Sequence, residues 1–535
     1  MIGFFQKHQK TVFLTLLALI SAGAGVYIAV CTQYALWGFS DSAAYLSAAR
    51  NFAAGKGLGL ISADGNFAPL LIFAPFYSVF LSLFALFNAD LIVTVRILDI
   101  LFFTILVAAS GWLFYKITSS FWLGLCFAVM IATTPVLGVS FTSIMSEPLA
   151  MVLSIPGFLL LIYALKQNST KWLLLSALLT GLSLLTRYAF AAIPAAGVLC
   201  VLLLSNQPLR KRLFAALKFG LVSFTPMLAW IAVQLFSKFS VGSRTYSMDF
   251  SLTEKISQFA SQLFAVLKYW LPYRTNMIPG VRAEVFRPIL LLLFAAVIVV
   301  GLYLSINKSK ASERGHTETL AIALGLVITT YLLVLLVIYT ISTETISIDD
   351  RMLSPIIPML YSLLLACAQV ISRKLHPNLT FPFLGVVIAL FFVVFNIPTF
   401  KAYPIVVGNY PNGYTSPVWK ENLILTGEVA LPQERPLITN APDIVLFYLN
   451  RSAYTLSTSA KAGGSDLFIG DQARLEDMLY NQCAVLVLFN PDQVQRFEGL
   501  PNAVTAADIA ALQGQLDTVY SSANGIVLED NECNN

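Results

Sequence analysis

Two acidic residues, each next to a long apolar run, are candidates for a catalytic carboxylate. Asp41 follows the first apolar run and opens an amphipathic stretch, residues 40–54, where Tyr45 lies on the same helical face. Glu147 begins a later apolar run, in the sequence Ser-Glu-Pro. Two carboxylates brought together can accept a proton and orient a nucleophile or a cation. The structural alternatives are a helix N-cap formed by Ser40 or Asp41, and a favourable charge that Glu147 places at a helix N-terminus.

Two arginines at the ends of other apolar runs suit the binding of a phosphate. Arg351 precedes one run in Asp-Arg-Met-Leu-Ser-Pro, and Arg187 ends another in Leu-Thr-Arg-Tyr. A guanidinium is always charged, and its fork of N–H groups matches phosphate oxygens. Alternatively, Arg351 anchors its helix at the membrane interface and pairs with one of the two aspartates that precede it. Arg96 and Asp99, three residues apart in one apolar run, are predicted to form a structural ion pair.

A basic and aromatic segment, residues 237–286, separates two further apolar runs. It includes Lys268 and Arg274 among several tyrosines and a tryptophan. Such a surface beside a bilayer could hold an anionic lipid headgroup or stack on sugars, and it is equally typical of an ordinary interfacial belt.

The sequence offers no metal-binding motif. It has three histidines, and none of its six cysteines forms a CxxC or another metal-ligand spacing. Four cysteines lie in apolar runs, where a cysteine behaves as a small core residue. Cys483 and Cys533 lie in the polar C-terminal part. They pair if that part faces an oxidising compartment, and otherwise they are two free thiols.

The composition is that of an integral membrane protein. Of 535 residues, 57% are hydrophobic and 11% are charged, whereas soluble proteins have about 25% charged residues. The formal net charge of +5 is spread along the chain, so no electrostatic argument favours a nucleic acid as a partner.

Apolar runs of a length that can cross a bilayer recur along the chain, so we expect an α-helical membrane protein with about 11 to 13 transmembrane helices. The runs are 11–31, 91–115, 120–140, 147–165, 171–188, 189–204, 213–236, 287–306, 319–341, 355–371 and 381–398.

The basic residues between these runs predict the orientation. Short loops rich in Lys and Arg stay in the cytoplasm, and all such segments fall on one side only if a further apolar run, 69–87, does not cross. We therefore expect an interfacial or re-entrant helix there, within a first external loop, residues 32–90. The N-terminus of the transmembrane domain, residues 1–399, is then cytoplasmic. The protein is expected to be a multi-pass protein of the plasma (inner) membrane.

The remaining segment, residues 400–535, differs in character. Short apolar runs at 436–439 and 484–489 alternate with helical stretches at 443–449 and 472–480, which predicts a small α/β domain. Counting the predicted crossings from a cytoplasmic N-terminus places this domain outside the cytoplasm. It has no Gly-rich phosphate loop, so we assign it to substrate contact or packing.

The order of these motifs resembles the GT-C glycosyltransferases, most of all the aminoarabinose transferases and protein O-mannosyltransferases, with bacterial oligosaccharyltransferase more distant. The likeness covers residues 11–396. Its motifs are Asp41 with the tyrosine and the Ala-Arg-Asn-Phe-Ala-Ala-Gly-Lys-Gly that follow, Ser146-Glu-Pro-Leu, Leu185-Thr-Arg-Tyr and Asp350-Arg-Met-Leu-Ser-Pro-Ile-Ile-Pro.

The resemblance implies a membrane glycosyltransferase. Its donor would be a polyprenyl-phosphate-linked sugar, transferred with inversion to a lipid, glycan or protein acceptor on the external face. Asp41 would be the base or the carboxylate that orients the acceptor, and Glu147 the second acid, where many relatives have Asp. Arg351 and Arg187 would bind the donor phosphate. The candidates for substrate contact are Tyr45, Lys268 and Arg274.

The resemblance leaves two questions open. Some relatives bind a divalent cation and others need none, so a cation is allowed and no cofactor is obligatory. The chain could also be a lipid-linked-sugar flippase or transporter, or a non-catalytic membrane scaffold. Transporters commonly have internal repeats and polar groups at the bilayer midplane, whereas the candidate acids and arginines here lie at external helix ends, which favours chemistry at one face.

Overall fold

A computed structural model provides the three-dimensional structure of the chain. It describes residues 2–34, 36–63, 65–70, 72–236, 251–272, 282–307, 315–342, 347–376, 381–409, 413–456, 468–469, 472–490 and 514–534.

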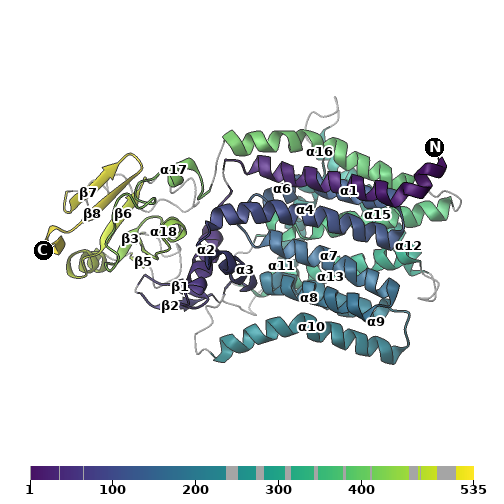
Figure 1. The fold of residues 1–535 in the computed structure, drawn as a ribbon, viewed down its shortest axis with the longest axis horizontal. Coiled ribbons are helices and arrows are strands. Elements are labelled where there is room, and N and C mark those ends of the chain that lie inside the picture. Colours follow the sequence, from purple (N-terminus) through teal and green to yellow (C-terminus); the bar gives the residue numbers. More distant parts are fainter. Residues whose placement is uncertain are drawn as a thin grey trace.

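Long apolar helices pack side by side in a bundle (Figure 1). Side chains on its outer surface, such as Leu292 and Val299, are apolar and exposed, as expected for a surface solvated by lipid. The helices of the bundle are α1 (Ile2–Cys31), α4 (Leu91–Thr118), α5 (Phe121–Ala132), α6 (Pro135–Ser140), α7 (Glu147–Gln167), α8 (Thr170–Thr186), α9 (Ala192–Leu204), α10 (Leu209–Phe236), α12 (Ala283–Ile306), α13 (His316–Ile341), α15 (Ile356–Leu375) and α16 (Phe383–Asn409).

The predicted α-helical membrane fold is confirmed. In the described part of the chain, eight helices are long and apolar enough to cross a membrane. Shorter apolar helices cover the other three predicted runs, at Phe121–Ala132, Thr170–Thr186 and Tyr188–Leu204. The number of crossings therefore stays a prediction.

A short helix takes the place of a crossing in the predicted first external loop. After α2 (Ser40–Ala53), the antiparallel strands β1 (Gly59–Ile61) and β2 (Phe67–Pro69) lead to α3 (Phe76–Ala85). The ten residues of α3 span about 15 Å, half of the roughly 30 Å of hydrocarbon in a bilayer. This helix is thus too short to cross, in agreement with the expectation for residues 69–87.

One predicted contact within the bundle is wrong. Arg96 does not pair with Asp99, because its guanidinium turns to the end of α1. There it donates to Thr32 Oγ1 at 3.2 Å and to the carbonyl of Ala29 at 3.3 Å. The last carbonyls of a helix have no partner within the helix, and the Arg96 guanidinium supplies one to Ala29.

The C-terminal part folds around a six-stranded sheet of order β5-β4-β3-β6-β8-β7. The first four strands in this order are parallel, and β8 and β7 add an antiparallel edge that the sequence did not lead us to expect. Its elements are α17 (Pro417–Lys420), β3 (Leu437–Thr439), α18 (Pro442–Leu449), β4 (Tyr454–Leu456), β5 (Phe468–Ile469), α19 (Gln472–Glu476), a π-helical turn (Asp477–Asn481), β6 (Val485–Phe489), β7 (Asp517–Ser522) and β8 (Gly525–Glu529).

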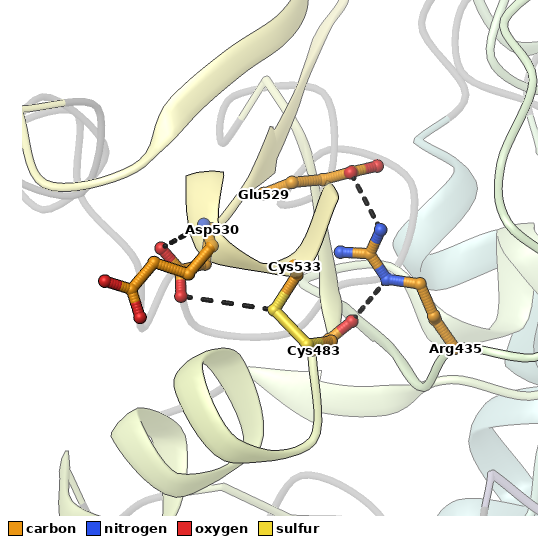
Figure 2. The surroundings of a disulfide bond; sticks show 6 residues. Arg435, Cys483, Glu529, Asp530 and Cys533 are labelled. Carbon is orange, nitrogen blue, oxygen red and sulfur yellow. Dashed lines mark hydrogen bonds and ion pairs between the residues drawn. A yellow bond between two sulfur atoms is a disulfide. The ribbon is translucent and has the colours of Figure 1, made fainter. Parts of the chain in front are cut away.

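A disulfide between Cys483 and Cys533 fastens this sheet, with 5.5 Å between the two Cα atoms. Figure 2 shows Arg435 beside it, donating to the carbonyl of Cys483 at 2.6 Å and to the carboxylate of Glu529 at 3.0 Å. The structure therefore contains the disulfide and not the alternative of two free thiols. The bond joins the chain just before β6 to the chain just after β8.

The C-terminal sheet lies at one end of the bundle, opposite the N-terminus (Figure 1). Helix α18 packs on α2, and Arg50 of α2 donates to the carbonyl of Phe447 at 2.9 Å. The backbone N–H of Tyr414 donates to the carbonyl of Gly38 at 3.1 Å. Gly413 allows this approach, because it has a positive φ of 80° and a side chain there would collide with the carbonyl of Gly38. Helix α2 thus links the bundle to the sheet.

Candidate active site

A short backbone pairing brings the two acids to the same end of the bundle. The N–H of Trp37 donates to the carbonyl of Thr142 at 2.9 Å, and the N–H of Ile144 donates to the carbonyl of Trp37 at 2.8 Å. The segments that lead into α2 and α7 therefore run side by side. Each acid lies in the first turn of its helix, so the two carboxylates approach each other.

The helix cap leaves the Asp41 side chain available. The N-cap of α2 is Phe39, whose N–H donates to the hydroxyl of Ser42 at 3.0 Å. The alternative in which Ser40 or Asp41 caps the helix is therefore wrong, since both lie within the first turn. The carboxylate of Asp41 instead accepts a hydrogen bond from Arg351.

Four charged side chains meet at this point. Arg351 bridges the two acids, donating from Nε to Glu147 Oε1 at 2.5 Å and from its other end to Asp41. Arg187 Nη1 lies 2.6 Å from the same oxygen of Glu147. Two arginines and two carboxylates cancel in formal charge, which makes their burial tolerable. The Glu147 side chain is only 2% exposed, whereas that of Arg351 is 43% exposed and can reach a ligand.

Arg351 does not pair with the aspartates before it. Asp349 caps α14 (Asp350–Leu353) by accepting from the N–H of Met352 at 2.9 Å. Asp350 accepts from the indole N–H of Trp270 at 2.9 Å. With both neighbours engaged, Arg351 turns to the acids from the other helices. Burial acts to lower the pKa of Arg351, but the charges of Glu147 and Asp41 outweigh burial and raise it above its usual range.

The buried side chain of Tyr45 supports the charged cluster through Ser146. It is 3% exposed, and its ring packs against Phe73 and Tyr77. Its hydroxyl shares a hydrogen bond of 3.1 Å with Ser146 Oγ, which also accepts from Arg187 at 3.3 Å. Burial raises the pKa of Tyr45 to about 12, so the hydroxyl keeps its proton at neutral pH. This buried position fits a role in holding Arg187 better than the predicted contact with substrate.

A cavity of about 880 Å³ opens beside the cluster, with Glu147 and Arg351 in its wall. Most of the wall comes from α6, α15, α16 and the end of α11 (Leu252–Trp270), and it is largely apolar, although Asp349 and Asp350 also line it. A second, apolar cavity of about 190 Å³ lies between α11, α12, α15 and α16. Both cavities share four wall residues, Trp270, Leu271, Ile357 and Tyr361. The two cavities are therefore neighbours, the larger beside the charged cluster and the smaller among the membrane helices.

The basic segment 237–286 contributes less than expected. Lys268 lies on α11 with its Nζ 5.9 Å from the centre of the Phe264 ring, and it does not line either cavity. Arg274 lies outside the described residues. Trp270 from the same segment does reach the site, through its hydrogen bond to Asp350. The sequence signal for Trp270 is an aromatic residue at the end of an amphipathic helix, where a membrane interface is expected.

In this arrangement a guanidinium takes the space between the two acids. Within the described ranges, no group of three or more His, Cys, Asp and Glu side chains could hold a metal ion. Arg351 occupies the space between Asp41 and Glu147, where a bridging cation would have to bind. The donor set therefore fits a guanidinium better than a divalent metal, which prefers several oxygen ligands.

The bundle, the helices α2 and α3 at its end and the sheet together define a polytopic membrane protein with the GT-C fold. No family model matches the chain, and no curated protein matches it in sequence. The evidence for the fold comes from solved structures of GT-C glycosyltransferases.

The Archaeoglobus fulgidus oligosaccharyltransferase in its apo form is similar with a TM-score of 0.52 and 12% identity, over 99% of this chain and 75% of that one. The same enzyme tethered to an acceptor peptide gives a TM-score of 0.50 and 12% identity, over 91% and 70%. ArnT from Cupriavidus metallidurans gives 0.48 and 12%, over 98% of both chains. At 12% identity, the likeness to the oligosaccharyltransferase establishes the fold alone, and it confirms the GT-C fold that the motifs led us to expect.

Proposed function

We propose that this protein is a membrane glycosyltransferase that transfers a sugar from a polyprenyl-phosphate-linked donor to a lipid, glycan or protein acceptor. The observation that carries the proposal is the cluster of two carboxylates and two guanidiniums, two of which, Glu147 and Arg351, line a largely apolar cavity. The cluster lies at one end of the bundle, which favours transfer at one membrane face over the transporter alternative. The GT-C fold supports the same class of activity.

The donor phosphate binds Arg351, with Arg187 behind it, and the polyprenyl chain follows the apolar cavities between the helices. Guanidinium forks suit phosphate oxygens, and Arg351 is the more exposed of the two arginines. Binding of the phosphate competes with Asp41 for Arg351. The carboxylate of Asp41 then becomes available to the acceptor at the moment when the donor is in place.

Transfer is a single displacement at the anomeric carbon. The acceptor oxygen forms the new bond, while the bond from the anomeric carbon to the phosphate oxygen breaks and its electron pair leaves with the lipid phosphate. Arg351 and Arg187 stabilise that developing negative charge, because they are already oriented toward it. Asp41 orients the acceptor hydroxyl or takes its proton, and the displacement inverts the sugar.

The site faces the outside of the cell in this proposal. The disulfide of the C-terminal domain suits an oxidising compartment. At the end of the bundle away from the sheet, Lys166 donates to the carbonyl of Lys116 at 2.8 Å, and this end is rich in Lys and Arg, as expected for the cytoplasmic face. We also propose that Arg351 replaces a divalent cation between the two acids.

The test is to incubate the purified protein with a panel of polyprenyl-phosphate sugars and candidate acceptors, and to measure donor consumption and product. Asp41→Asn is expected to abolish transfer while the protein still inserts and folds. Asp517→Asn, which changes an exposed acid on β7, serves as a matched control and keeps wild-type transfer. Full activity in Asp41→Asn would end the proposal, as would movement of the donor across the membrane without transfer.

A further inference from the structure

A third acid approaches the cluster, from the C-terminal domain. Asp443 lies in the first turn of α18, four residues after the parallel strand β3 ends. Residues that follow the carboxyl ends of parallel strands are common in binding sites. Phe447, one turn further on the same face, packs against Gly38, next to the start of α2. Asp443 therefore faces the end of α2 that carries Asp41.

Tyr414 holds Asp443 in this position. The backbone of Tyr414 is bonded to Gly38, and its side chain is hydrogen-bonded to the carboxylate of Asp443. Burial and the negative charge of Asp41 raise the pKa of Asp443 to about 6, although the hydrogen bond from Tyr414 opposes the shift. Asp443 is thus near enough to Asp41 for the two charges to interact.

The two acids differ in their partners. Asp41 is bound by Arg351, whereas no Lys or Arg in the described ranges forms an ion pair with Asp443. The other groups around it are engaged. Arg50 donates to a backbone carbonyl of α18 at 2.9 Å, and Tyr448 donates to the carbonyl of Tyr414 at 2.7 Å. No opposite charge stabilises the ionised form of Asp443, so this carboxylate can accept a proton from an acceptor hydroxyl.

We propose that Asp443 is the residue that takes the proton of the acceptor hydroxyl, while Asp41, next to Arg351, orients that hydroxyl. This inference rests on the proposed glycosyltransferase function. As the acceptor oxygen bonds to the anomeric carbon and the lipid phosphate leaves with the electron pair of the broken bond, the hydroxyl proton passes to Asp443, which later releases it to water.

The geometry of the displacement agrees with this division of labour. A nucleophile attacks on the side opposite to the leaving group. In this proposal the leaving phosphate lies at Arg351, beside the apolar cavity that Arg351 lines. Asp443 belongs to the domain on the other side of Asp41. The acceptor therefore enters between α2 and the C-terminal domain.

The charges at this entrance indicate the chemical class of the acceptor. Asp41 and Asp443 together repel a phosphate or carboxylate nucleophile, and such an anion needs no base. A neutral hydroxyl needs one and is attracted by two carboxylates that accept its hydrogen bond. The acceptor class that fits is an alcohol, on a sugar, a lipid or a Ser or Thr side chain.

The experiment is the pH dependence of kcat/KM for transfer between pH 5 and 8. Because activity needs ionised Asp443, the wild type is expected to lose activity as the pH falls through about 6. Asp443→Asn is expected to lower kcat/KM by about 10²- to 10⁴-fold, the usual contribution of a general base, and to abolish this acid limb. Asp477→Asn, an exposed acid of the same domain, serves as the control and keeps the wild-type profile.

The outcomes separate the two proposals. If the wild type consumes no polyprenyl-phosphate sugar, both fall. If it transfers the sugar and Asp443→Asn keeps the acid limb, with or without a lower rate, only the role of Asp443 is overturned. Should Asp443→Asn fail to fold, Asp443→Glu keeps the carboxyl group and displaces it by one methylene. Its acid limb is then expected at a shifted midpoint, and an unmoved midpoint would overturn the inference.

Discussion

Arg351 is the residue on which the charge balance of the site depends. Its guanidinium contacts one carboxylate at each end, which only a rigid, forked cation can do. A lysine has a single ammonium on a flexible stem and cannot hold both acids in the same way. In the proposed reaction, the same cation also stabilises the leaving lipid phosphate. Loss of Arg351 would then affect both the placement of the two carboxylates and the stabilisation of the leaving group.

We expect Arg351→Lys to lower the rate of transfer by about 10²-fold or more, the effect of removing one preorganised donor at a developing charge. Treatment of the wild type with a metal chelator is expected to leave the rate unchanged, because Arg351 supplies the cation between the acids. Both are measured as initial rates of donor consumption. Arg210→Lys, at an exposed position in the first turn of α10, is the control.

Two results would contradict this view of Arg351. One is a chelated enzyme that loses activity and recovers it when a divalent cation is added back. The other is an Arg351→Lys variant that transfers the sugar as fast as the Arg351 enzyme.

At the scale of elements, α2 and the C-terminal sheet depend on each other. Helix α2 carries Asp41 and is packed between α3 and α18. Helix α18 follows β3, and β3 pairs with β6, which begins beside the disulfide. A looser sheet would therefore release α18, and with it Asp443, from the end of α2. The disulfide contributes to the site without touching it.

We expect the double change Cys483→Ser and Cys533→Ser to destabilise the C-terminal domain by about 2–4 kcal/mol, the usual contribution of a disulfide. The measurement is a thermal melt of the detergent-solubilised protein, in which the domain should unfold several degrees earlier. Cys126→Ala removes a free, half-buried thiol of the bundle and should leave that transition in place. A double variant that melts as the wild type does would show that the bond adds nothing to the domain.

On the scale of the whole molecule, the chain has two chemically different ends. The sheet, its disulfide and the charged cluster lie at one end, and the N-terminus lies at the other (Figure 1). Apolar helices occupy the space between them. Because charged loops and a folded polar domain cannot lie in hydrocarbon, the two ends must lie on opposite faces of the membrane.

We expect the end with the sheet to lie outside. Two exposed positions can report the orientation: Glu434 in the C-terminal domain and Lys374 at the other end of the bundle. Each is replaced in turn by a cysteine. A membrane-impermeant maleimide added to intact cells should label Glu434→Cys at once, and Lys374→Cys only after the membrane is permeabilised. The reverse pattern would invert the orientation and place transfer in the cytoplasm.

Local patterns in the sequence were enough for the elements and for much of the site. Apolar runs predict helices, since each run satisfies its own backbone hydrogen bonds in lipid. The positions of Lys and Arg indicate which helix ends share a face. Asp41, Glu147, Arg351 and Arg187 were candidates for this reason, and the structure brings all four together.

Only the tertiary structure decided which side chains form pairs. Arg351 contacts partners 204 and 310 residues away and leaves its neighbouring aspartates to other groups. Arg96 turns from Asp99 to another helix. Asp443 gave no signal beyond its place after a strand, and its nearness to Asp41 depends on how the sheet docks on α2. Spacing along the chain determines the face on which a residue lies, whereas the partner of a charge depends on which elements pack together.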